Sequence, residues 1–154
     1  TDGSISLLKT VQTTSYAEGD DGDLQKGVEW PGERFVDNGD NTISDTLTGL
    51  TWQKDVTSNQ YSFSAAITYC ESLPGASGWR LPNVLEWESL INYEEADQEA
   101  WLAAQGFTGF TTPVDQFWTS TTAAYSTSYR WVVYTDTGEI DSGSLDQYVL
   151  AVTD

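Results

Sequence analysis

Close pairs of carboxylates are the groups in this sequence best suited to acid–base chemistry. Glu86 with Glu88 and Glu94 with Glu95 form two such pairs, and glycoside hydrolysis needs only two carboxyl groups. Glu86, however, stands where a helix-capping residue is expected, and Glu94–Glu95 is typical of a solvated helix end. The chain has no His and one Cys. Without His, a Ser nucleophile lacks its usual activating base, and a metal site lacks its commonest ligand. We therefore expect a protein that is not an enzyme.

Binding chemistry is better represented, and it is concentrated in the last part of the chain. Of the 37 residues from Trp118 to Asp154, 20 are Ser, Thr, Tyr or Asp and none is Lys. Tyr gives a large amphipathic contact at a low entropic cost, and Ser adapts around it, as in antibody paratopes. The candidate ligand-binding residues are Tyr125, Ser126, Ser128, Tyr129, Tyr134, Asp136, Thr137, Asp141, Ser142, Ser144, Asp146 and Gln147.

An apolar skeleton runs between these candidates and predicts how they are held. Its members are Trp118, Trp131, Val133, Gly138, Ile140, Val149 and Val152. Residues alternate between the two faces of a strand, so the skeleton is expected to point inward and the candidates to share one solvent-facing patch. Tyr125, Tyr129 and Tyr134 are the expected anchors. An ordinary β-rich terminus would have a similar composition, because Ser and Thr suit exposed strand faces.

The charge of the chain limits its partners. It carries 24 Asp and Glu against 6 Lys and Arg, for a formal net charge of −18. Such a field repels phosphate backbones and anionic headgroups, and no basic stripe offsets it. No apolar run is long enough to span a bilayer. We expect no nucleic-acid partner and no membrane insertion, and a partner that is a protein or glycan on another cell or particle.

Two acidic segments could hold a cation, but both have a simpler explanation. The run 18–23 contains three Asp and one Glu but lacks the frame of an EF-hand loop. Asp37, Asp40 and Asp45 lie around the expected turn at Asn38–Gly39 and could together hold a cation, but turn chemistry already accounts for two of them. We expect no cofactor, with a structural Ca²⁺ at 18–23 as the alternative.

The elements that position these residues begin with an arm over residues 1–33, which includes a short strand at Ile5–Leu8. A hairpin follows, with strands at 34–37 and 42–45 around Asn38–Gly39, the strongest local hairpin signal. Further strands are expected at 51–53, where Trp52 is buried, at 131–134 with a return at Ile140, and at 148–152.

Helical signals occupy the middle of the chain. Ser62 or Ser64 can cap a helix whose apolar residues have helical spacing: Phe63, Ala66, Ile67, Cys70 and Leu73. Asn83 and Glu86 form a capping box for a second helix with Val84, Trp87, Leu90 and Ile91 on its inner face. A third is expected at 96–105. Arg80 is expected in a carboxylate network, and Trp52, Trp79, Trp118 and Trp131 in the core.

Four ordered segments resemble the Legionella collagen-like protein C-terminal domain family. They are Arg34–Asp45 with Thr48–Lys54, Trp79–Asn83 with Glu86 and Leu90, Phe117–Thr122, and Tyr148–Val149. Gln12–Tyr16 and Gly19–Gly27 also look like the lead-in of bacterial members. The resemblance implies an α+β, C-type lectin-like fold with two main helices on small twisted antiparallel sheets. The chain lacks the basic residues that some relatives use for sulfated glycans, and a Cys partner for Cys70.

The tail alone is similar to the variable regions of diversity-generating retroelement proteins. Adenine-directed mutagenesis in those systems yields Tyr, Ser, Thr and Asp at positions held on a rigid C-type lectin-like face. The resemblance implies one receptor or adhesion domain over 1–154, with its variable region at 117–154, displayed extracellularly on a cell or virion. The start at Thr1 fits a processed or excised chain. A glycan-binding domain and an oligomerising domain of a surface fibre are the alternatives.

Overall fold

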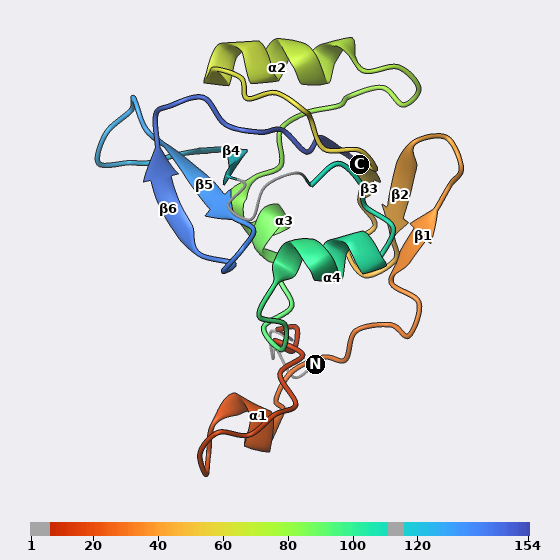
Figure 1. Ribbon diagram of the computed structural model, residues 1–154, viewed down its shortest axis with the longest axis vertical. Coiled ribbons are helices and arrows are strands. Elements are labelled where there is room, and N and C mark those ends of the chain that lie inside the picture. Colours follow the sequence, from red (N-terminus) through yellow and green to blue (C-terminus); the bar gives the residue numbers. More distant parts are fainter. Residues whose placement is uncertain (1–6, 111–115) are drawn as a thin grey trace, which may run out of the picture.

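A computed structural model describes residues 7–110 and 116–154 and contains two small antiparallel sheets and four short helices in that part of the chain (Figure 1). The first sheet has the strand order β1-β2-β3-β7. Its strands are β1 (Phe35–Asp37), β2 (Thr42–Asp45), β3 (Thr51–Gln53) and β7 (Val152–Thr153). The predicted hairpin is confirmed, because β1 and β2 pair antiparallel around Asn38–Gly39. The predicted strand at 51–53 is confirmed as β3, which pairs with β2.

The second sheet has the order β4-β5-β6 and carries most of the candidate residues. Its strands are β4 (Gln116–Thr122), β5 (Arg130–Tyr134) and β6 (Ile140–Gly143). The strand at 131–134 and its return are confirmed, whereas β4 was not predicted. Of the strand expected at 148–152, only residue 152 belongs to a strand, β7. Tyr148 instead forms an isolated bridge with Phe117, which joins the tail to the second sheet before the chain reaches the first.

The helices begin where the capping residues predict. Ser62 caps α2 (Phe63–Ser72), and Asn83 with Glu86 forms the capping box of α3 (Val84–Glu88). The third predicted helix is α4 (Gln98–Ala104), capped by Asp97. A short helix, α1 (Asp21–Leu24), lies in the acidic run of the arm. Asp20 caps α1 by accepting from the Asp23 amide.

Two predicted helix faces need correction. Ile67 is 39% exposed, because Phe63, Ala66 and Cys70 face the core and leave Ile67 on the outer side of α2. Leu90 and Ile91 are buried as expected, but they follow α3 instead of belonging to it.

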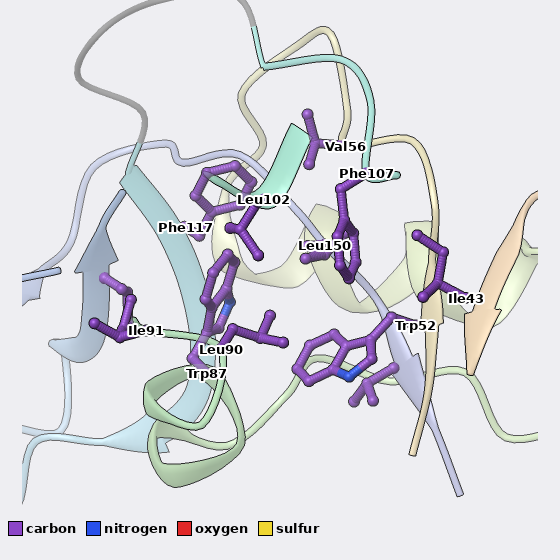
Figure 2. Packing of buried hydrophobic residues seen from close by; sticks show 12 residues of the cluster. Ile43, Trp52, Val56, Trp87, Leu90, Ile91, Leu102, Phe107, Phe117 and Leu150 are labelled. Carbon is purple, nitrogen blue, oxygen red and sulfur yellow. The ribbon is translucent and has the colours of Figure 1, made fainter. Parts of the chain in front are cut away.

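The core consists of two clusters, one on each face of the second sheet. The first lies between the two sheets and contains Trp52, Trp87, Phe107 and Phe117 among others, as Figure 2 shows. The second lies under α2 and includes Cys70, whose burial raises the pKa of its thiol to about 12. Trp52, Trp79 and Trp118 are buried as predicted. The same prediction is wrong for Trp131, which is half-buried because it lies beyond the edge of the first cluster.

Arg34, which is buried, and Arg80, which is half-buried, pair with carboxylates. The Arg34 guanidinium donates to both carboxylate oxygens of Asp45 at 2.9 and 2.7 Å, and both side chains are almost fully buried. Arg80 donates to both oxygens of Glu86 and to Asp154, which confirms the expected network. Glu86 is thus the helix cap that its position in the capping box predicted, and it is also the ion-pair partner of Arg80, which the sequence did not indicate.

The described part of the arm is held to the body by a residue that was expected to be solvated. The Glu94 carboxylate accepts hydrogen bonds from the amides of Thr13 and Thr14 and from the Thr14 hydroxyl. Leu8 forms a parallel bridge with Val28, whereas residues 5 and 6 of the expected strand lie outside the described residues. Glu94 is therefore an anchor for the arm, and the expectation of a free helix end is wrong.

Candidate functional site

The connection between β4 and β5 carries four of the candidate residues and is closed by its own backbone. The Ala123 amide donates to the Tyr129 carbonyl, Ser126 to Ala123, and Tyr129 to Ser126, each at 3.0 Å. We call residues 123–129 the tyrosine loop. These three bonds fix the loop in a compact conformation above the end of the second sheet.

Three aromatic rings meet on this loop and the adjoining strand. The Tyr125 ring centre lies 6.4 Å from that of Tyr129 and 6.4 Å from that of Trp131, with the Trp131 ring nearly perpendicular. The Tyr125 hydroxyl also donates to the Ser142 hydroxyl on β6. Tyr125 is 69% and Tyr129 39% exposed. We call Tyr125, Tyr129, Trp131 and Ser142 the aromatic cluster.

Arg130 supports the tyrosine loop from the other face of β5. Its Nη1 donates to the carbonyls of Thr127 at 2.6 Å and Tyr129 at 3.1 Å. Its Cζ lies 4.2 Å from the centre of the Phe63 ring on α2. Among the described residues, Lys9, Arg34, Lys54 and Arg80 pair with carboxylates, whereas Arg130 has no carboxylate within ion-pair distance. Its hydrogen bonds therefore serve the loop.

Both faces of β5 are covered, which decides where each neighbouring side chain can lie. Val133 belongs to the first cluster and Val132 to the second. Trp131 shares the Val133 face, and its strand partner is Ser142. Because only the end of β5 extends beyond the two cores, the exposed rings gather at that end.

The structure does not bring all the candidates into one patch. Tyr125, Ser126, Ser128, Tyr129 and Ser142 lie at the tyrosine-loop end of the second sheet. Asp136 and Thr137 lie in the turn beyond the opposite end of β5, which spans about 13 Å at a rise of about 3.3 Å per residue. The prediction of a single patch is wrong, since it assumed that the loops at both ends of the strand converge.

Three further candidates lie apart from the aromatic cluster. Gln147 is buried, at 4% exposure, because its backbone pairs with Tyr61, so its expected exposure is wrong. Tyr134 is half-buried and packs against the second cluster, which removes it from the expected anchors. Asp141 is exposed but pairs with Val132, on the face opposite Trp131.

A polar pocket collects the remaining candidates. It has a volume of about 570 Å³ and is lined by Gln60, Gln116, Ser144, Leu145, Asp146 and Gln147. Sequence reasoning missed Gln60 and Gln116, which carry no local signal. It also missed the role of Arg130. The signal that could have found it is that the chain has only 6 Lys and Arg, so each one is a candidate for a specific contact.

Carboxylates of the two acidic segments that were candidates for a cation site instead bind groups of the protein itself. The Asp20 carboxylate accepts hydrogen bonds from the backbone amides of Asp23, Tyr16 and Ala17, which lower its pKa. Asp45 pairs with Arg34 and Asp37 with Lys54. Over residues 7–110 and 116–154, no group of three or more His, Cys, Asp or Glu side chains is arranged to hold a metal ion.

Comparison with known protein families supplies the identification. The family model described as the Lcl C-terminal domain matches residues 41–153, more than two thirds of the chain. The chain belongs to the Lcl C-terminal domain family. A search of curated proteins gives no match. The match begins within the hairpin, so the resemblance quoted for the arm and for residues 34–40 lies outside it.

The Lcl C-terminal domain match includes the aromatic cluster and both sheets, except for β1. Membership of this family suggests a surface-associated domain. Among the described residues, no helix is long and apolar enough to cross a membrane. The mixed α/β architecture with two small antiparallel sheets agrees with the predicted α+β class.

Proposed function

We propose that this domain binds a protein ligand through the aromatic cluster and is not an enzyme. The observation that carries the proposal is the pair of exposed rings, Tyr125 and Tyr129, held in place by Trp131 and Ser142. Exposed Tyr and Trp dominate binding hot spots, because they bury a large area and lose little side-chain entropy. Rings that are already fixed lose less freedom still on binding.

The net charge of the domain favours a basic partner. The chain has a net charge of −18, and the cation at the site, Arg130, is engaged by the tyrosine loop. A basic protein surface would be attracted to this acidic domain during the encounter. The ligand we propose is therefore a protein with a positive patch, carried on another cell or particle.

A finer proposal concerns the origin of the tail. We propose a C-type lectin-like scaffold whose variable region, 117–154, is diversified by a retroelement and displayed extracellularly. The Tyr, Ser and Asp residues at the tyrosine loop and β6 support this idea, since they are frequent products of adenine-directed mutagenesis. A second copy of the last ~35 codons that differs only at adenines, found in the genome near the gene, would support this proposal. The absence of such a copy from that region would contradict it.

The binding proposal is tested by display of two libraries. One randomises Tyr125, Ser126, Ser128, Tyr129 and Ser142, and the other randomises five exposed residues of the hairpin and arm: Tyr16, Leu24, Val36, Asp40 and Asn41. Both are selected against lysozyme, a basic protein. We expect folded members of the first library to yield binders and the second to yield none.

Each outcome has a definite meaning. Surface substitutions usually change stability by about ±0.5 kcal/mol each, so most members of the first library should melt within a few degrees of the parent. If its members unfold, or if binders arise equally from both libraries, the aromatic cluster is structural. The scaffold role within a surface fibre would then take the place of the binding proposal.

A further inference from the structure

We infer a second binding site, for a neutral saccharide, in the pocket between β3, the following segment 54–61 and α2. This site is separate from the aromatic cluster and does not depend on the function proposed for it. The pocket has a volume of about 310 Å³, and its lining includes Gln53, Asp55, Thr57, Ser58, Tyr61 and Tyr69. That volume lies at the lower end of the range for small-molecule sites, which suits one sugar ring.

Two aromatic rings form one wall of the pocket. The ring centres of Tyr61 and Tyr69 lie 5.3 Å apart with an angle of 37° between their planes. Both side chains are half-buried, so each ring keeps part of its surface toward the pocket that it lines. An aromatic wall packs against the apolar C–H faces of a pyranose, and its hydroxyl edges remain available to bind polar atoms.

The buried side chains that line the pocket carry hydrogen-bond donors that no acceptor in residues 7–110 and 116–154 uses. Gln53 is 6% exposed; its Oε1 accepts from the Ala151 amide and its Nε2 donates to the Tyr69 hydroxyl at 2.6 Å. Thr57, also 6% exposed, accepts from the Val149 amide. The second amide hydrogen of Gln53 and the single hydroxyl hydrogens of Thr57 and Tyr69 have no acceptor among the described residues. The amides of Ala151 and Val149 hold the side-chain oxygens of Gln53 and Thr57 in place.

Acceptors at the rim complement those donors. Asp55 is exposed and uses one carboxylate oxygen for the Thr108 hydroxyl, which leaves the other oxygen free in the described structure. The hydroxyls of Ser58 and Tyr61 make no hydrogen bond within residues 7–110 and 116–154. Burial raises the pKa of Tyr69, so its hydroxyl stays protonated and can donate at neutral pH.

This pattern selects a polyol over other small ligands. Every sugar hydroxyl is at once a donor and an acceptor, and the pocket offers inner donors and rim acceptors within one small volume. An anionic ligand is disfavoured because Asp55 lines the pocket, no cation does, and the net charge is −18. An apolar ligand would leave Gln53 and Thr57 with unpaired buried hydrogens. The class that fits is a neutral hexose or N-acetylhexosamine.

The test is a titration of the whole chain followed by NMR. The neutral probes are methyl α-mannoside, methyl β-galactoside and N-acetylglucosamine, and the anionic probes are glucuronate and galactose 6-sulfate. We expect one neutral sugar to shift the Gln53 side-chain amide with a Kd on the order of 1 mM, as its small size allows. Tyr69→Phe and Asp55→Asn should each weaken that binding about fivefold, the effect of one lost hydrogen bond.

Controls separate this site from the aromatic cluster. The double substitution Tyr125→Ala with Tyr129→Ala should leave the titration unchanged, and thermal melting checks that each variant is folded. If the Gln53 amide does not respond to any neutral sugar, or responds equally to the anionic ones, the inference is overturned. If binding is lost only in the double variant, the sugar binds at the aromatic cluster and not in the pocket, and the inference is overturned. Failure of the library experiment leaves this result untouched.

Discussion

The Arg130 guanidinium stacks on the Phe63 ring, with Cζ 4.2 Å from the ring centre, while its Nη1 holds two carbonyls of the tyrosine loop. One side chain thereby connects the start of α2 to the loop that presents Tyr125 and Tyr129. Because Arg130 has no carboxylate partner among the described residues, its role is mechanical support of this surface.

We expect Arg130→Met to loosen the tyrosine loop while the domain remains folded. The change removes two hydrogen bonds and a cation–π contact of about 1 kcal/mol, yet retains an apolar chain over Phe63. Hydrogen exchange of the Ser126 and Tyr129 amides, which bond within the loop, should become faster. Lys26→Met removes the same charge from an exposed position, and it should leave these amides unchanged. Equal protection in both variants would contradict the supporting role.

The turn between β5 and β6 depends on Gly138, which packs against Ile91. Gly138 has φ +74°, and an added Cβ would lie 2.9 Å from Ile91 Cγ2. Gly39 has φ +76° with nothing within 4 Å of its added Cβ, so it isolates the cost of the backbone conformation. We expect Gly39→Ala to cost about 1–2 kcal/mol and Gly138→Ala about 1–3 kcal/mol more, from overpacking. Equilibrium unfolding measures the difference, and equal losses would refute the close contact.

The arm should detach from Glu94 under acid conditions. The Thr14 hydroxyl, with the Thr13 and Thr14 amides, lowers the pKa of Glu94 from 4.5 to about 2. A lowered pKa means that this anchoring is fully present above pH 4.5 and is lost as the pH falls toward 2. Exchange of the Thr13 and Thr14 amides should therefore rise across that window, after correction for the intrinsic rate.

Substitution separates this anchor from the general effect of acid. Glu94→Gln should expose the two threonine amides already at pH 7, because a neutral amide oxygen accepts more weakly than a carboxylate. Glu95→Gln changes the adjacent exposed residue and serves as the control. Protected amides in Glu94→Gln would show that other contacts hold the arm.

The buried pair of Arg34 and Asp45 should be sensitive to the loss of either charge. Asp45→Asn leaves a buried guanidinium without its counter-charge, and such a change typically costs about 3–5 kcal/mol. Asp37→Asn removes an exposed pair with Lys54, and it should shift the denaturation midpoint little. Urea unfolding of the two variants gives the comparison. Similar midpoints would mean that solvent reaches Arg34 once Asp45 is neutral.

The sequence by itself determined the local features of this protein. Asn38–Gly39 specified the first hairpin, and Asn83 specified where α3 begins. Ser62 and Ser64 were both candidate caps for α2, and the structure has Ser62 as the cap. Turn and cap chemistry acts over three or four residues, so the residue types suffice to predict it. The same holds for the burial of Trp52, Trp79 and Trp118, each of which lies in an apolar pattern or motif.

Only the tertiary structure decided which surface carries the candidate site. Coverage of both faces of β5 confines the exposed rings to one end and leaves Asp136 beyond the other. Two contacts join segments that are far apart in the sequence. Arg130 packs over the Phe63 ring, and Glu94 accepts hydrogen bonds from the arm. A pattern of period two distinguishes the faces of a strand, but it cannot say what packs on each face or which end stays open. Those outcomes depend on the path of the whole chain, which brings α2, α3 and the arm to their places.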